Sequence, residues 1–331
     1  MRALDTAGNR GQRPRMAASG REPDDSRSVS GGTIPGSGGV PAFTLSRSDA
    51  SPIPVLIAVP HAGRHYPQAL VDRMRSPRLS AMKLEDRYAD KLAEAVVRET
   101  DAALLIAHAP RAMIDLNRAV EDMDWDMVRN GTPSGFPRMR IGRRARSGLG
   151  LVPRRLPEIG EVWNARMEPE DVEARIDSVY QPYHDALAET LRDLRERWGA
   201  ALLIDLHSMP PLGRRGTGDP VPDFVIGDRF GASCAGSLCA AAFDHIAWSG
   251  RAVSHNRPYA GGHVLERHAA PSKGLHAIQL EVCRGAYLDE RLDEPGAGFD
   301  GIVDVIGGLV RRLAEEVATL GRGAGLALAA E

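Results

Sequence analysis

Two histidines and one glutamate stand at the ends of, or inside, strongly apolar segments of the sequence. His207 and His61 each follow directly on an aliphatic run, and Glu281 interrupts a third run. One such histidine alone is more often a structural residue than a ligand, but here three segments deliver polar groups in the same way. Ligands of open α/β sheets gather at the carboxyl ends of the strands, so we expect these side chains to meet there. Since buried carboxylates are rarely tolerated unless they are paired or bind a metal, the set favours a hydrolytic zinc site.

The elements that must position these residues follow from the hydrophobic pattern. Continuous apolar runs predict buried strands, and apolar residues spaced three and four apart predict amphipathic helices. The predicted strands are 54–60, 103–107, 200–210, 223–228 and 276–282, and the predicted helices are 84–97, 168–198, 231–248 and 302–320. The helix before the central strand indicates a βαβ-type crossover. The pattern therefore predicts an α/β fold with a mixed, largely parallel central sheet flanked by helices.

The composition predicts one catalytic domain preceded by a tail. Residues 1–48 are rich in Gly, Ser, Arg, Asp and Pro without apolar periodicity, and we expect them to form a disordered N-terminal tail. Residues 49–325 form the predicted single domain. Met16 is an alternative start to Met1.

Charge and hydropathy bear on partners and location. The formal net charge of -2 gives no electrostatic reason to expect nucleic acid or an anionic membrane as a partner. No run reaches the roughly 18 apolar residues of a spanning helix, and no signal-peptide core precedes residue 50, so we expect a cytoplasmic protein. The sequence has three cysteines without CxxC spacing, Cys234, Cys239 and Cys283, which suggest neither a thiolate zinc ribbon nor a disulfide framework.

Further ligands come from the neighbourhood of the first histidine. His61 and His65 have the i, i+4 spacing of a helical pair, but Gly63 and a following proline argue against a helix, so we interpret His65 as a hydrogen-bonding neighbour. Glu85 and Asp86 begin the predicted helix 84–97. They either complete a metal site or simply match the helix dipole.

Several arginines indicate anionic substrates. Arg118 follows a short apolar run and could clamp a substrate carboxylate, although pairing with Asp115 or Asp86 is nearly as plausible. The segment 129–155 is rich in arginine and is either a basic lid or a solvated surface excursion. Without interleaved aromatic residues it is a poor nucleic-acid surface.

Taken together, these motifs resemble those of the N-formylglutamate amidohydrolase family, a group of zinc hydrolases with a carboxypeptidase-like or aspartoacylase-like α/β fold. The matching pieces are 60–63, Asp86, 114–118, 205–208, Gly261-Gly262 with Arg267-His268, and 279–281 with Tyr287.

The resemblance implies a role for each matching residue. It implies one zinc ion bound by His61, Asp86 and His207, with Glu85 as the alternative carboxylate, and Glu281 as general base. We assign Arg118 to catalysis and substrate binding. The other predicted substrate-binding residues are Asn117, Gly261, Gly262, His268 and Arg284.

The expected reaction is release of formate from N-formyl-L-glutamate, a small-molecule substrate. The first alternative is a zinc deacylase or carboxypeptidase acting on another N-acyl amino acid or peptide. The second is a non-catalytic metal-binding relative, against which the presence of both histidines and Glu281 argues, because a binding module needs no buried base. As an alternative to the catalytic role, Glu281 is a structural residue that forms a salt bridge to Arg284 or Arg267.

Overall fold

The computed structural model describes residues 26–49, 51–131, 142–213 and 220–328. Within these, eight strands form one mixed sheet of order β1-β2-β4-β3-β7-β10-β8-β9. The strands of the sheet are β1 Ser26–Gly31, β2 Phe43–Ser48, β3 Val55–Val59, β4 Ala103–Ala107, β7 Ala201–Met209, β8 Phe224–Gly227, β9 Val253–His255 and β10 Leu275–Cys283. The predicted fold class is confirmed.

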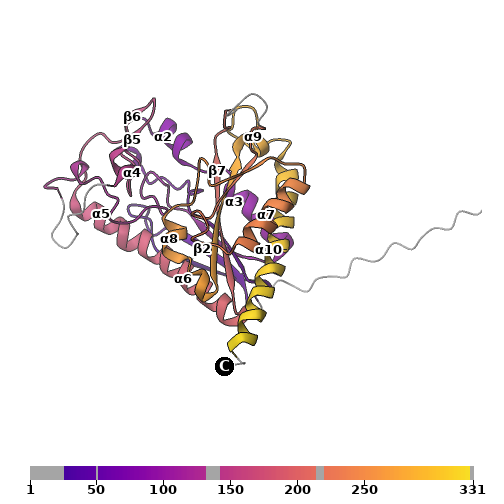
Figure 1. The fold of residues 1–331 in the computed structure, drawn as a ribbon. Helices are drawn as coiled ribbons and strands as arrows, with labels where there is room; N and C mark the ends of the chain where they lie inside the picture. The colour runs from indigo at the N-terminus through magenta and orange to yellow at the C-terminus, as the bar shows by residue number, and fades with distance from the viewer. Residues whose placement is uncertain (1–25, 50, 132–141, 214–219, 329–331) are drawn as a thin grey trace, which may run out of the picture.

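Helices cover both faces of the sheet (Figure 1). The α-helices are α1 Gln68–Val71, α2 Pro77–Leu84, α3 Ala89–Thr100, α4 Arg143–Arg146, α5 Pro169–Arg175, α6 Gln181–Trp198, α7 Gly236–Trp248, α8 His263–His268, α9 Arg284–Tyr287 and α10 Phe299–Leu328. A π-helical turn, Ile176–Tyr180, joins α5 to α6. Helices α3, α7 and α10 pack on one face, where their apolar residues share a core cluster with Ile204 and Ile278, whereas α5 and α6 cover the other face.

The central strands β3, β7 and β10 run parallel and are almost wholly buried. Every residue of β7 is buried, which explains its continuous aliphatic sequence. In the register of β10 with β7, Glu281 stands opposite His207. The apolar run 112–118 forms turns, in which Asp115 N donates to Leu151 O at 2.7 Å.

The prediction of a disordered tail over residues 1–48 is wrong for residues 26–48. Strands β1 and β2 pair with each other, and β2 also pairs with β4, so the sheet begins well before residue 49. Phe43 is buried and contacts the ring of Tyr183 edge-on, at a centroid distance of 6.0 Å. Serines and arginines dominate these two strands, which hides their alternation. Residues 1–25, with Met16, lie outside the described residues.

The predicted helix 84–97 is also wrong in its first turn. Helix α2 ends at Leu84 and α3 begins at Ala89. In the break, Tyr88 adopts a left-handed conformation with φ 57°, and Asp86 N donates to His61 O at 2.9 Å. Asp86 is therefore turned toward the sheet edge by a chain reversal, which a helical pattern cannot reveal.

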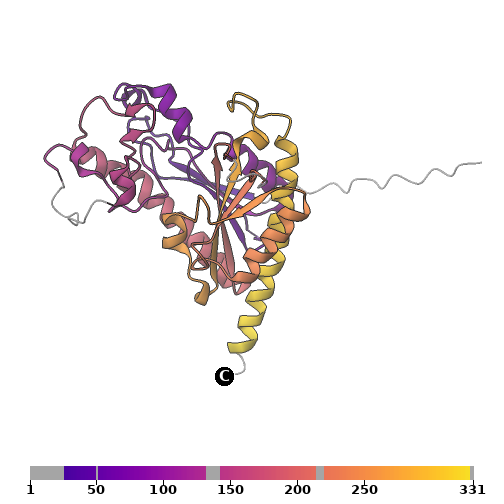
Figure 2. The ribbon, with the colours of Figure 1, turned by 45° about the horizontal axis from the view of Figure 1, so that its top comes forward.

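The arginine-rich region carries several short elements. These are the 3-10 turn Trp125–Met127, helix α4, and the hairpin of β5 Arg155–Leu156 with β6 Gly160–Glu161. A further 3-10 turn, Pro271–Lys273, precedes β10. Figure 1 places α2, α4, α9 and the hairpin at the same end of the molecule, and Figure 2 shows the chain of this region from a second side. In the described part of the chain, no helix is both long and apolar enough to cross a membrane.

Candidate metal centre and active site

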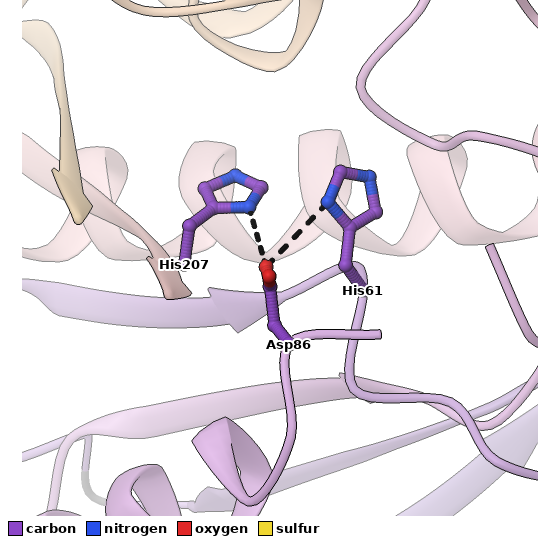
Figure 3. A group of neighbouring side chains, drawn as sticks. All are labelled: His61, Asp86 and His207. Atoms are coloured by element: carbon purple, nitrogen blue, oxygen red, sulfur yellow. Dashed lines mark hydrogen bonds and ion pairs between the residues drawn. The ribbon is translucent and has the colours of Figure 1, made fainter. Parts of the chain in front are cut away.

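His61, Asp86 and His207 form a buried cluster at the carboxyl ends of β3 and β7 (Figure 3). The Nδ1 atom of His207 lies 2.9 Å from Asp86 Oδ2, and Nδ1 of His61 lies 3.6 Å from the same oxygen. The two imidazole centroids are 4.8 Å apart. The cluster thus gathers two ring nitrogens around one carboxylate oxygen.

Each imidazole is oriented by a second carboxylate at its other ring nitrogen. Nε2 of His61 lies 2.8 Å from Asp115 Oδ1, and Nε2 of His207 lies 2.9 Å from Asp205 Oδ2. Arg111 Nε in turn donates to Asp115 Oδ2 at 2.9 Å. A carboxylate behind a histidine fixes its tautomer and increases the basicity of the other nitrogen. Both Nδ1 atoms are therefore left to face the cluster.

The second oxygen of Asp86 is held from the protein side. Ser208 Oγ donates to Asp86 Oδ1 at 3.2 Å, and Arg284 Nη2 lies 3.5 Å from it. Arg284 Nε donates to Ser208 Oγ at 3.0 Å, and its Nη atoms donate to the carbonyls of Met82 and Glu85. All three nitrogens of Arg284 thus have protein acceptors, although we predicted it to bind substrate.

The two sequence alternatives to these ligands lie outside the cluster. The carboxylate of Glu85 is buried, but it interacts with Tyr66 and lies 3.4 Å from Arg87 Nη1. His65 is exposed, and its backbone N–H donates to His108 O at 3.2 Å. The chain reversal before α3 therefore presents Asp86 to the imidazoles and turns its neighbour away.

The cluster is electrostatically suited to a positive charge. Burial alone lowers the pKa of His207, but the carboxylates of Asp205 and Asp86 outweigh it and raise that pKa well above its usual value. Burial raises the pKa of Asp86, but the hydrogen bond with His207 and the electrostatic interaction with His61 hold it well below its usual value. A cation among these groups, either a proton or a metal ion, is therefore favoured.

The donor set also fits a metal ion. Nδ1 of His61 is buried and has no hydrogen-bond partner, an arrangement that is costly unless the nitrogen serves as a ligand. The three donor atoms lie within 4.8 Å of one another. Two imidazoles and one carboxylate are a known ligand set of catalytic zinc, which keeps a further coordination position open. These residues could therefore hold a divalent metal.

Glu281 lies beside the cluster as a buried carboxyl group. It is 6 % exposed, and Gln279 Nε2 donates to its Oε1 at 2.7 Å. Burial raises the pKa of Glu281 to about 7. Neither Arg284 nor Arg267 forms an ion pair with it, although both are described, so the salt-bridge alternative has no geometric support here. A carboxyl group with this pKa can both accept and release a proton near neutral pH.

A cavity of about 800 Å³ adjoins the cluster. Among the residues assigned from sequence, those that line it are His61, Asp86, Asn117, Arg118, His207, Gly261, Gly262, Glu281 and Arg284. His268 is not among the lining residues. Its ring is buried and stacked on His184, with Nε2 2.9 Å from His184 Nδ1. The predicted substrate contact of His268 therefore has no geometric support.

Asn117 and Arg118 are fixed to the walls of this cavity. Asn117 Oδ1 accepts from Val264 N at 2.8 Å, and its Nδ2 lies 3.2 Å from Nε2 of His207. A Cβ atom on Gly262 would lie 2.3 Å from Asn117 Oδ1, so this close approach requires glycine. Arg118 Nε and Nη1 donate to the carbonyls of Leu149 and Asn117, at 3.0 and 2.9 Å.

Sequence reasoning did not assign roles to the outer residues of the site. Asp205 and His207 are two apart in a strand and so share a face, a signal that could have joined them. No local pattern in the sequence links Asp115 or Arg111 to His61, because Asp115 and His61 are 54 residues apart in the chain.

A buried His–Asp–His cluster with a glutamate beside it, at the carboxyl ends of the parallel strands of an α/β sheet, is the arrangement expected of a metal-dependent hydrolase. The comparisons narrow this class. The model of the N-formylglutamate amidohydrolase family matches residues 53–288, and the chain belongs to that family. It is accordingly an amidohydrolase that acts on a small molecule.

Individual relatives agree with this membership. The chain is 29% identical over 275 residues to an N-formylglutamate deformylase of Pseudomonas aeruginosa, covering 82% of this chain and 94% of the relative. A deformylase of the same name from Pseudomonas putida is 29% identical over 242 residues, which cover 72% of this chain and 83% of the relative. The crystal structure of N-formylglutamate amidohydrolase from Ralstonia eutropha JMP134 superposes with a TM-score of 0.75 at 30% identity, covering 83% of this chain and 98% of that one.

Proposed function

We propose that the protein hydrolyses the formyl amide of N-formyl-L-glutamate to formate and L-glutamate. The observation that carries this proposal is the meeting of the His61–Asp86–His207 cluster, Glu281 and Arg118 in one cavity. The names of the relatives from both Pseudomonas species support the substrate.

We further propose that the cluster holds one zinc ion. When bound, zinc supplies Lewis-acid activation of water and of the amide carbonyl. His61 and His207 would contribute their Nδ1 atoms, and Asp86 would contribute Oδ2, the atom that already faces both rings. The carboxylates behind the two rings would keep them in the ligating tautomer.

Glu281 is the proposed general base and acid. Its Oε1 is occupied by Gln279, so its Oε2 is the oxygen available to take a proton from water. The same carboxyl group would deliver that proton to the leaving amine, whose expulsion from the tetrahedral adduct requires protonation. In the metal-free protein burial raises the pKa of Glu281 to about 7, so this carboxyl group takes up a proton more readily than an ordinary glutamate.

Arg118 is the proposed clamp for the α-carboxylate. Two of its nitrogens are anchored on backbone carbonyls, which fixes the guanidinium and leaves Nη2 for a ligand. A fixed guanidinium binds a carboxylate with little further loss of conformational entropy. Asn117 and the backbone of Gly261 and Gly262 form the adjoining wall of the proposed substrate site.

Formate release from N-formyl-L-glutamate, measured together with metal content, tests the proposal. We expect about one zinc ion per chain, and His207→Ala to lose zinc and activity together. His65→Ala is the matched control, because His65 is an exposed histidine outside the cluster. A His207→Ala variant that binds zinc as tightly as wild type would show that the metal is held elsewhere.

A further inference from the structure

Six cationic side chains of the described residues line the cavity, and five of them are engaged by the protein. The engaged pairs are Lys83 with Glu158, Arg111 with Asp115, Arg118 with the Leu149 and Asn117 carbonyls, Arg229 with Glu266, and Arg284 with Ser208 and Asp86. The sixth is Arg144. Its side chain is exposed and, among the described residues, has no ion pair and no hydrogen bond.

The backbone of Arg144 is nevertheless fixed next to the proposed α-carboxylate clamp. Asp122 Oδ1 accepts from the adjacent backbone N–H of Ala145 at 3.3 Å, which anchors α4. Leu149 N donates to Arg144 O at 2.9 Å, while Leu149 O accepts from Arg118 Nε at 3.0 Å. The same turn therefore holds both arginines at one side of the cavity.

The guanidinium groups of Arg118 and Arg144 lie on one side of the cavity, and the single carboxylate of Asp122 interacts with both of them. Burial is the largest cause that lowers the pKa of Arg118. The carboxylates of Asp115 and Asp122 raise that pKa, while the charges of Arg111 and Arg144 lower it, as expected when positive charges are close. An N-acyl derivative of an acidic amino acid carries two carboxylates a few bonds apart. Such a dianion can satisfy both arginines at once, whereas a substrate with a neutral side chain can satisfy one.

We propose that Arg144 is a specificity-determining residue that binds the side-chain carboxylate of an acidic N-acyl amino acid, while Arg118 binds the α-carboxylate. This inference rests on the proposed function and assigns to one residue the choice of an acidic over a neutral side chain. It also gives helix α4 a role at the substrate site. Because Arg144 is exposed, its contribution weakens as salt screens the charge.

The experiment compares kcat/KM for N-formyl-L-glutamate and N-formyl-L-glutamine, which differ in side-chain charge but hardly in shape. In Arg144→Gln we expect kcat/KM for N-formyl-L-glutamate to fall about 10-fold, because the variant loses one exposed hydrogen bond to a charged group. We expect kcat/KM for N-formyl-L-glutamine to stay the same. Arg144→Glu should lower kcat/KM for N-formyl-L-glutamate further, and it should raise kcat/KM for N-formyl-L-lysine. Arg146→Gln is the matched control, because Arg146 is exposed on the same helix and does not line the cavity.

The outcomes separate this inference from the function on which it rests. The assignment of Arg144 is wrong if wild type has the same kcat/KM for both substrates, or if Arg144→Gln lowers kcat/KM for both by the same factor. The proposed function stands in either case. Equal effects of Arg144→Gln and Arg146→Gln would likewise overturn the assignment of Arg144. If zinc-loaded wild type cleaves neither substrate, both proposals fail.

Discussion

Replacing Glu281 by Gln should abolish turnover and stabilise the metal-free protein. The amide keeps the shape, and its Oε1 can still accept the hydrogen bond from Gln279 Nε2. It cannot accept a proton, so we expect kcat to fall by roughly 10²-fold or more. Formate release at saturating substrate measures this effect, in protein whose zinc content matches wild type.

The stability effect has the opposite sign. Burial raises the folded-state pKa of Glu281 from 4.5 to about 7. The raised pKa means that this group contributes stability below pH 4.5, and that the contribution is lost as the pH rises through about 7. At about 1.4 kcal/mol per pKa unit, the loss at pH 8 is about 3 kcal/mol.

Chemical denaturation of metal-free protein at pH 5 and pH 8 tests the sign. The Glu281→Gln variant should unfold with a larger free energy than wild type at pH 8, and the difference should shrink at pH 5. Gln279→Ala is a useful companion, because it removes the hydrogen-bond partner and leaves the carboxyl group. A folded, zinc-loaded Glu281→Gln enzyme with most of its activity would refute the assignment of the base, and a variant less stable than wild type at pH 8 would refute the burial argument.

Three further predictions concern the supports of the site. Arg284→Lys loses the contacts that orient the Asp86 carboxylate, so zinc affinity measured by chelator competition should fall about 10- to 100-fold while the protein stays folded. An unchanged zinc affinity would show that Arg284 has no such role. Gly262→Ala places a Cβ atom 2.3 Å from Asn117 Oδ1 and should lower the free energy of unfolding by about 1–3 kcal/mol, whereas Gly236→Ala, which meets no atom within 4 Å, should not. Burial lowers the folded-state pKa of His268 to about 3, so the stability that this group contributes above pH 6.5 is lost as the pH falls toward 3. When the pH is lowered from 7.5 to 5, the free energy of unfolding of wild type should fall by about 2 kcal/mol more than that of His268→Gln. Equal losses in the two proteins would contradict this prediction.

The sequence predicted the central sheet well and its edge poorly, for one physical reason. Strands β3, β7 and β10 are buried on both faces, so most of their residues are apolar and stand out from the rest of the chain. Strand β1 is the edge strand of the sheet and β2 is its neighbour, and most residues of both are only partly buried or exposed, so serine and arginine are tolerated there. Their pairing depends on β4, a partner that no local pattern identifies.

The same reasoning explains which site residues could be found. His207 and Glu281 were recognisable because a polar residue in an apolar run needs a partner. Asp86 was recognisable only as one of two adjacent carboxylates, because the turn that selects it is set by a hydrogen bond to His61 O. Asp115 could be paired with a histidine only after the chain had been folded.

The contacts of the site show how two strands can set the geometry of residues that are not on them. His207 and Glu281 stand opposite each other on β7 and β10, so the sheet register fixes the distance between the proposed ligand and the proposed base. Asp86 lies on a turn, but Ser208 on β7 and Arg284 directly after β10 hold its Oδ1. The turn is thereby tied to the same two strands. We therefore expect the loss of the contacts of Ser208 and Arg284 with Asp86 to change metal affinity. A change in the register of β7 and β10 should change metal affinity and proton transfer together.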